Sequence, residues 1–85
     1  MRIHFSNRYD KECQKLTAKI KRQADDRIRL FASNALHPLL NNHSLTGKFE
    51  GCRSINVSGD YRAIVEIYAD AYLFIRIGTH SQLYE

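Results

Sequence analysis

The chain has 85 residues, a length that accommodates one small domain, and its 44% of hydrophobic residues can supply a compact core. No stretch approaches the roughly 20 apolar residues of a membrane-spanning helix, and no signal-peptide pattern opens the chain, so we expect one cytoplasmic domain over residues 1–85. The formal net charge of +4 favours a nucleic acid or an acidic protein as partner.

The first half of the chain predicts a strand followed by helices. Arg2–Phe5 is short and extended, and Ser6 or Asn7 can cap a following helix because a short polar side chain accepts from a free backbone N–H. Apolar residues then recur at helical steps of three and four: Tyr9, Cys13, Leu16, Ile20, Ala24, Ile28, Phe31 and Ala35. A single helix of this length would extend beyond the sheet of so small a domain, so we expect a helical hairpin with its break near residues 21–25. Pro38 ends the helical region, since the residue before a proline avoids helical conformation.

The second half predicts strands. After a polar loop over residues 41–51, the apolar period changes to two, which predicts strands at Cys52–Val57, Tyr61–Tyr68 and Tyr72–Gly78. The short turns between them indicate an antiparallel meander. The predicted fold class is therefore α+β, with the N-terminal strand and the helical hairpin packed on one face of a small antiparallel sheet.

Residue parity separates a dry face of this sheet from a charged face. The apolar set, expected beneath the helices, is Tyr61, Ala63, Val65, Ile67, Leu73, Ile75 and Ile77. The opposite set is Arg62, Ile64, Glu66, Tyr72, Phe74 and Arg76, joined by Ser54 and Asn56. In the plainest interpretation the charged face is an ordinary solvated surface, on which Glu66 and Arg76 form a cross-strand ion pair.

The register of the last hairpin suggests a second interpretation. A hairpin that turns about Asp70 makes Arg62 and Arg76 diagonal neighbours. The same register brings Asp60 opposite His80. Two guanidiniums near an imidazole, with a carboxylate beside it, can hold a phosphodiester and move its protons.

The cysteines and histidines do not predict a metal site. Cys13 and Cys52 are far apart and form no CxxC pair, so we expect reduced packing residues. The four histidines show neither an i,i+4 pair nor zinc-finger spacing. We expect no metal and no cofactor.

Four short segments of the second half stand in a characteristic order: HSLTG (His43–Gly47), GCR (Gly51–Arg53), GDYR (Gly59–Arg62) and IGTHSQLY (Ile77–Tyr84). Their order and spacing resemble those of the RelE/ParE superfamily of type II toxins, and most closely its YafQ branch. The resemblance covers residues 43–85, about half of the chain. The first half matches in its strand and helical pair.

The resemblance implies a ribosome-dependent endoribonuclease that cuts messenger RNA in the ribosomal A site without a metal. In such enzymes the ribose 2′-hydroxyl attacks the neighbouring phosphate. The reaction needs one group to take the 2′-proton, another to protonate the departing 5′-oxygen, and cations to stabilise the phosphorane. The implied partners are the ribosome, messenger RNA and an antitoxin that holds the toxin silent.

The motifs assign catalytic candidates residue by residue. His80 matches the histidine of the C-terminal GTH motif and is the first choice for proton transfer, because an imidazole exchanges protons near neutral pH. Asp60 matches the carboxylate in the turn before the next strand and would orient His80 or carry a second proton. His43 matches the histidine that opens the HPL-type motif, with Ser44 in place of the usual proline, and would act opposite His80. Tyr84 matches a terminal aromatic residue that would stack on a base.

The resemblance also implies basic residues around the phosphate. Arg53 and Arg62 match basic positions common in the superfamily, and Arg62 would clamp the phosphate, with Arg53 and Arg76 as further candidates. Asn56 stands where YafQ-type enzymes carry another histidine. An amide can hydrogen-bond a phosphate or ribose but cannot exchange a proton, so a weakened or specialised toxin is a second possibility.

Three other functions compete with this one. A ParE-like toxin shares the fold but acts on DNA gyrase, and that subgroup generally lacks the pairing of His80 with Tyr84. A decayed toxin would only dock its antitoxin. A generic basic RNA-binding domain would be expected to carry an RRM or KH signature, and none is present.

Overall fold

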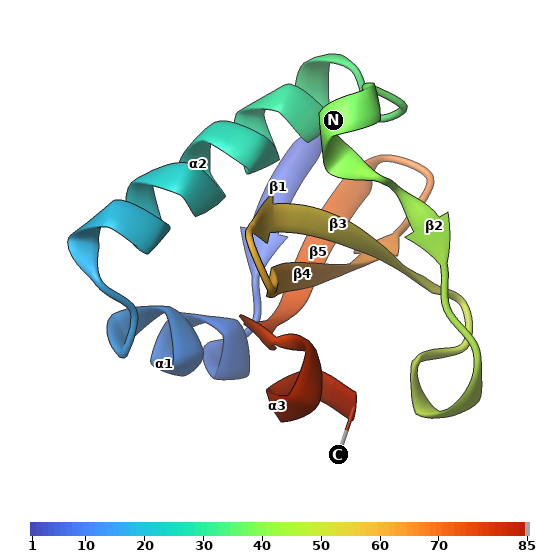
Figure 1. Ribbon diagram of the computed structural model, residues 1–85. Helices are drawn as coiled ribbons and strands as arrows, with labels where there is room; N and C mark the ends of the chain where they lie inside the picture. The colour runs from blue at the N-terminus through green and yellow to red at the C-terminus, as the bar shows by residue number, and fades with distance from the viewer. Residues whose placement is uncertain (85) are drawn as a thin grey trace.

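The computed structural model describes residues 1–84; Glu85, the last residue of the predicted domain, lies outside the described residues. Its core is a five-stranded sheet of order β1-β5-β4-β3-β2 with helices around it (Figure 1). This confirms the predicted α+β class and the order of strand, two helices and strands. The elements are β1 Arg2–Phe5, α1 Asn7–Gln14, α2 Ala18–Ser33, the 3-10 helix η1 Pro38–Leu40, β2 His43–Ser44, the 3-10 helix η2 Gly47–Phe49, β3 Cys52–Ser58, β4 Tyr61–Ile67, β5 Ala71–Thr79 and α3 His80–Tyr84.

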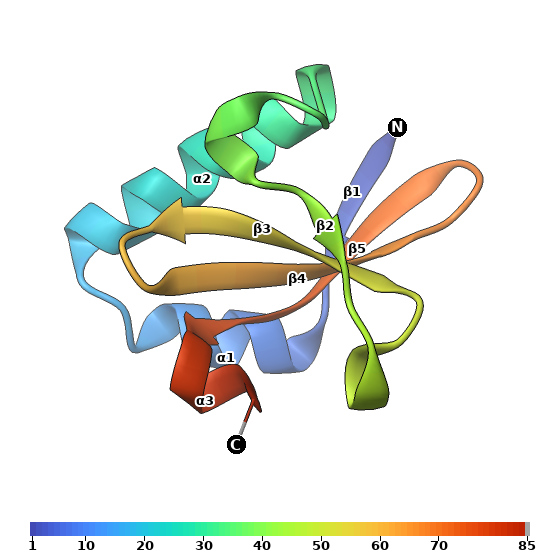
Figure 2. The same ribbon diagram turned by 45° about the vertical axis from the view of Figure 1, so that its right-hand side comes forward.

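The sheet is mixed, so the prediction of a purely antiparallel sheet was wrong at one edge. β1 runs parallel to β5, with Arg2 opposite Ala71 and Phe5 opposite Phe74. β3, β4 and β5 form the predicted antiparallel meander. That meander leaves one edge of β5 free, and the first strand occupies it, as Figure 2 shows.

Both predicted helices are present, but the break between them lies at residues 15–17 rather than at 21–25. Ser6 caps α1, its hydroxyl accepting from the Tyr9 amide at 3.0 Å, as predicted. Thr17 caps α2 in the same way, accepting from the Ile20 amide at 3.3 Å. The break was misplaced because this second capping residue was not recognised. α2 ends at Ser33, and Pro38 opens η1 instead of directly ending the long helix.

One side of the sheet carries the main hydrophobic core. Apolar side chains of α1 and α2 pack there against strand residues; the fully buried members are Ala24, Leu40, Ile55, Val57, Ala63, Val65 and Phe74. Phe31 is 1% exposed and sets its ring edge-on against Phe74, with 5.8 Å between centroids. Such burial is the main source of stability in a domain of this size.

A β-bulge in β5 overturns part of the predicted parity. The register changes from Ile64 opposite Arg76 to Val65 opposite Phe74, so Ile75 is the extra residue. Phe74 therefore enters the helix-side core, while Ile75 packs on the other side. Parity predicted the opposite for both residues, because a bulge reverses which side chains face the core.

The other side of the sheet is covered by two elements that were not predicted. α3 and η2 contribute Leu83 and Phe49, which pack against Cys52 and Ile64. Figure 2 shows both elements on the side of the sheet away from α2. Burial raises the pKa of the Cys52 thiol, and likewise that of Cys13 against the helix-side core, which fits the prediction that both are packing residues.

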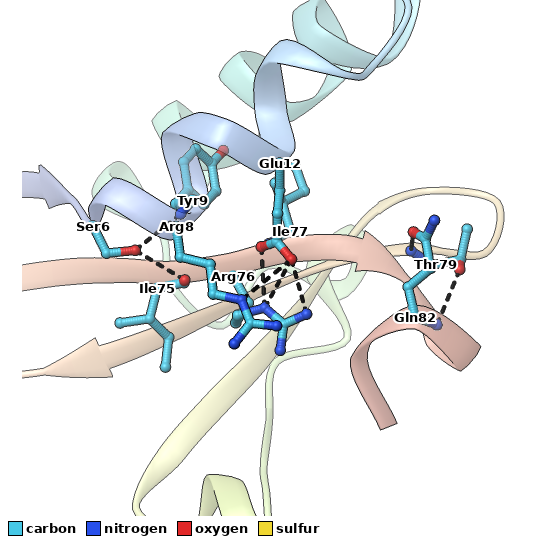
Figure 3. A network of polar contacts seen from close by, with 9 residues as sticks. All are labelled: Ser6, Arg8, Tyr9, Glu12, Ile75, Arg76, Ile77, Thr79 and Gln82. Carbon is cyan, nitrogen blue, oxygen red and sulfur yellow. Dashed lines mark hydrogen bonds and ion pairs between the residues drawn. The ribbon is translucent and has the colours of Figure 1, made fainter. Parts of the chain in front are cut away.

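α1 closes the edge of β5 beyond the end of β1 (Figure 3). The Ser6 hydroxyl donates to the Ile75 carbonyl at 2.9 Å, and the Ile77 amide donates to a Glu12 carboxylate oxygen at 3.1 Å. The same carboxylate pairs with Arg76 at 2.8 Å, and the Arg76 side chain is only 8% exposed. The side chains of Glu12 on α1 and of its N-cap Ser6 thus supply hydrogen bonds that a longer β1 would have made.

Candidate functional site

A pocket of about 420 Å³ opens on the side of the sheet that carries α3. β2, β3, β4 and α3 all contribute to its wall. The lining residues are Asn41, His43, Leu45, Ser54, Arg62, His80 and Tyr84. Four of the five predicted catalytic residues therefore meet at one cavity, although His43 and Tyr84 are 41 positions apart in the chain (84 − 43).

His43 reaches the pocket because β2 pairs with β3, where His43 lies opposite Ser54. Asn41, two residues earlier, has a left-handed backbone (φ 44°), and its carbonyl oxygen lies 2.8 Å from His43 Nδ1. A carbonyl only accepts, so in the neutral imidazole the proton sits on Nδ1 and the lone pair on Nε2. Nε2 is therefore the nitrogen that can take a proton.

His80 is the first residue of α3. Its backbone amide donates to the Asp60 carbonyl at 3.2 Å, which confirms the predicted register of these two residues across the end of the β4–β5 hairpin. The His80 ring lies 4.7 Å from the ring of Tyr84, one helical turn later. Tyr84 also meets Phe49 edge-on at 5.9 Å. Asp60 itself is exposed in the turn and does not line the pocket.

Arg62 brings the positive charge of the pocket. It lies opposite Gly78 on β5 and opposite Asn56 on β3. Its Nη1 donates to the Gly59 carbonyl at 2.8 Å and to its neighbour's carbonyl at 3.2 Å. Within residues 1–84 these contacts use one of three guanidinium nitrogens, so N–H donors remain for an anion.

The other two predicted arginines are not brought into the pocket. Arg53 alternates with Cys52 and Ser54, so it lies on the opposite side of the sheet, where its Nε donates to Asn42. Arg76 is held by Glu12, as described above. The alternative Glu66–Arg76 ion pair does not form either, because the bulge places Glu66 opposite Leu73.

Sequence reasoning placed Ser54 on the charged face but gave it no role. It is 1% exposed and lines the pocket, and its hydroxyl oxygen has no hydrogen-bond partner within residues 1–84. The buried amide oxygen of Asn56 is unpartnered in the same part of the chain. Asn41 and Leu45 also line the pocket and were missed, because nothing in the sequence signalled the two-residue strand β2 that positions them.

The described residues contain no group of three or more His, Cys, Asp or Glu side chains arranged to hold a metal ion. Over the same residues, no helix has the length and apolar character needed to cross a bilayer. The site that the structure assembles thus consists of two imidazoles, one guanidinium and a phenol ring around a shared cavity.

Comparison with known proteins identifies what this arrangement is similar to. The whole chain, residues 1–85, matches the family model described as the bacterial toxin of a type II toxin–antitoxin system, YafQ. The fold is similar to the crystal structure of YafQ from E. coli strain BL21(DE3), with a TM-score of 0.86, 22% identity and 100% coverage of both chains. It is also similar to the toxin in the E. coli DinJ–YafQ toxin–antitoxin complex (TM-score 0.81, 25% identity, 98% of this chain and 96% of that one).

A more distant likeness is to the YoeB/ParE toxin from Agrobacterium tumefaciens, with a TM-score of 0.80, 16% identity and coverage of 94% of this chain and 99% of that one. At this identity the likeness concerns the fold alone. A search of curated proteins gives no match.

Proposed function

The chain belongs to the YafQ family of toxins of type II toxin–antitoxin systems, and from that premise we propose that it is an endoribonuclease that cleaves messenger RNA in the ribosomal A site. The observation that carries this proposal is the convergence of His43, His80, Arg62 and Tyr84 on one pocket. Two imidazoles and a cation are the groups that metal-independent transfer of a phosphodiester requires.

His43 is the general base in this proposal. Its Nδ1–H is engaged by the Asn41 carbonyl, which leaves Nε2 to take the proton of the ribose 2′-hydroxyl. The 2′-oxygen then forms a bond to the adjacent phosphorus, and the bond from phosphorus to the 5′-oxygen of the next nucleotide breaks. The products are a 2′,3′-cyclic phosphate and a 5′-hydroxyl.

His80 is the general acid and protonates the departing 5′-oxygen. The exposed Asp60 lies in the turn directly before β4, and its backbone carbonyl accepts from the His80 amide. The Asp60 carboxylate is the group that would orient the His80 imidazole or return a proton to it. Arg62 stabilises the phosphorane, and Tyr84 stacks on a base of the message, a contact worth about 1–3 kcal/mol.

Arg53 and Arg76 have no phosphate-binding role in this proposal, because their guanidiniums are engaged on other parts of the molecule. Asn56, which replaces a histidine expected from the family pattern, would hydrogen-bond the ribose or phosphate without exchanging a proton. The proposed partners are the ribosome, messenger RNA and a cognate antitoxin, in the cytoplasm, and the proposed reaction uses no metal ion.

The proposal is tested with purified protein, ribosomes and a defined message, with the cut site mapped. We expect a cut within the A-site codon and a 2′,3′-cyclic phosphate at the new end. His80→Ala should slow cleavage by about 10²–10⁴-fold, the usual contribution of a general acid, and leave ribosome binding intact. His4→Ala is the matched control, since His4 lies exposed on β1, and it should cut normally.

Each alternative predicts a different result. Inhibition of gyrase supercoiling without RNA cleavage would support a ParE-like toxin. Tight binding of an acidic antitoxin with neither activity would indicate a toxin that has lost catalysis, as the replacement at Asn56 allows. Either result would overturn the nuclease proposal.

A further inference from the structure

The sequence that leads into α3 forms a reciprocal pair of hydrogen bonds (Figure 3). The Thr79 amide donates to the Gln82 side-chain oxygen at 2.8 Å, and the Gln82 amide donates to the Thr79 hydroxyl at 3.3 Å. This is a capping box, in which the residue before a helix and the third residue inside it satisfy each other's free backbone donors. It starts α3 at His80.

Gly78 makes room for the capping box. A Cβ atom built on Gly78 would lie 2.9 Å from the Gln82 side-chain oxygen, closer than real Cβ atoms approach other atoms, and 3.6 Å from Leu83. Gly78 is not one of the glycines that have a positive φ, so its backbone conformation is one that an alanine can adopt. Its small size is therefore needed for the close approach of Gln82 rather than for an unusual turn.

The capping box fixes two residues of the pocket together. His80 is the first residue of α3 and Tyr84 the last, and their rings are in contact. Leu83, fully buried, anchors the helix in the pocket-side core. Within residues 1–84 no hydrogen bond to the His80 ring is present, so the position of this ring depends on the start of α3 and on Tyr84.

We propose that Thr79 and Gln82 are positioning residues that set the place of His80 and Tyr84 in the pocket. The expected change in cleavage rate rests on the proposed nuclease function. The positioning of His80 and Tyr84 by the capping box does not. Neither residue touches the substrate; both act through the first turn of α3. Without the box, α3 loses two of its initial hydrogen bonds, and the imidazole spends less time where it can protonate the leaving oxygen.

The kinetic test compares three variants in single-turnover cleavage on ribosomes. Gln82→Ala should lower the cleavage rate about tenfold, the size expected from losing a capping interaction, with little change in affinity for the ribosome. Gln82→Glu should restore the rate, because a glutamate completes a capping box equally well. Ser81→Ala, at an exposed neighbouring position of the same helix, is the control and should cut normally.

Gly78→Ala provides an independent route to the same defect. The added methyl group should displace the Gln82 side chain from the Thr79 amide and slow cleavage by a similar factor. The double variant Gly78→Ala, Gln82→Ala should be no slower than the slower single variant, because both changes remove one interaction. Full additivity of the two effects would contradict the proposal.

A structural measurement separates this inference from the proposed function. Hydrogen exchange followed by NMR should show the Thr79 amide exchanging about tenfold faster in Gln82→Ala than in the wild type or Gln82→Glu. NOE contacts between the His80 and Tyr84 rings should weaken in parallel. If the wild type cuts no message but these NMR changes appear, the proposed function fails and the positioning survives. Unchanged exchange, or a rate loss that Gln82→Glu does not repair, would overturn the inference.

Discussion

The two faces of the sheet use the same strands but are closed in different ways (Figure 1). On the helix side, α1 and α2 cover residues such as Ala63 and Val65 so fully that neither is exposed at all. On the pocket side, the short elements α3 and η2 provide the cover, and a cavity remains around Arg62. Along β4, residues that stabilise the helix-side core, such as Ala63, thus alternate with residues on the pocket side, such as Arg62. Stability and activity should therefore be separable by choosing the face that a substitution affects.

The largest effect on folding is expected from Phe31→Ala on the helix side. Phe31 is 1% exposed, and the centroid of its ring lies 4.7 Å from that of Tyr72 and 5.8 Å from that of Phe74. Its removal should lower the free energy of unfolding by about 3–5 kcal/mol, measured by urea denaturation. Leu39→Ala, at a side chain that is 55% exposed, is the control and should be nearly neutral. Similar losses in both variants would mean that this core does not dominate stability.

Arg62→Ala is the corresponding test on the pocket side. Removing a cation that stabilises the phosphorane should slow cleavage by about 10²–10³-fold while the unfolding free energy changes little. Arg53→Ala removes the same charge from the opposite side of the sheet. Its cleavage rate should stay close to that of the wild type. An equal loss of activity in the two variants would show that overall charge, rather than the pocket, drives the reaction.

Glu12→Gln tests the edge where the two faces meet. It leaves the charge of the nearly buried Arg76 without its counter-ion but keeps an acceptor for the Ile77 amide. Because the Glu12 side chain is 22% exposed, we expect a loss of about 2 kcal/mol, less than for a fully buried pair. Arg8→Ala breaks only the exposed 3.8 Å contact to the same carboxylate and should be nearly neutral. Thermal or urea unfolding distinguishes the two.

Thr17→Ala tests the helix break that supports the helix-side core. Loss of the hydroxyl that accepts from the Ile20 amide should cost about 1 kcal/mol of stability. Thr17→Ser keeps the hydroxyl and should retain most of the stability. A neutral alanine variant would mean that α2 is held by its packing alone.

The smallest effect is expected at the surface, outside both faces. Arg2 and Asp70 form an ion pair at 3.0 Å, but their side chains are 73% and 75% exposed. Arg2→Ala should therefore change the unfolding free energy by less than about 1 kcal/mol, and less still at high salt. A loss comparable to that of Glu12→Gln would show that the β1–β5 edge is far more sensitive than its exposure indicates.

Much of the fold was predictable because periodicity reports burial. The strand at Arg2–Phe5, the Ser6 cap and the three-stranded meander all follow from local patterns, and the structure has each of them. The bulge at Ile75 was not predictable, since period-two alternation contains no signal for an inserted residue. The parallel pairing of β1 with β5 was not predictable from local patterns either, because the two strands are far apart in the sequence.

The sequence predicted which residues form the candidate site better than it predicted the elements and contacts that position them. The motifs supplied His43, Arg62, His80 and Tyr84, and the structure brings these four to one pocket. Arg76 was assigned to the pocket because nothing in the sequence links it to Glu12, 64 residues earlier. The start of α3 does have a local signal, because the T-x-x-Q pattern that ends in Gln82 is typical of a capping box.

The closure of the β5 edge by α1 also has a consequence for how this protein behaves in a crowded solution. An open strand edge offers unpaired amides and carbonyls on which another chain can assemble, a common origin of aggregation. Beside the second half of β5, the Ile75 carbonyl and the Ile77 amide are already engaged by the side chains of Ser6 and Glu12. This part of β5, next to the segment that carries His80, is therefore protected from pairing with a strand of another molecule. The edge strands β1 and β2 are where such intermolecular pairing would have to occur.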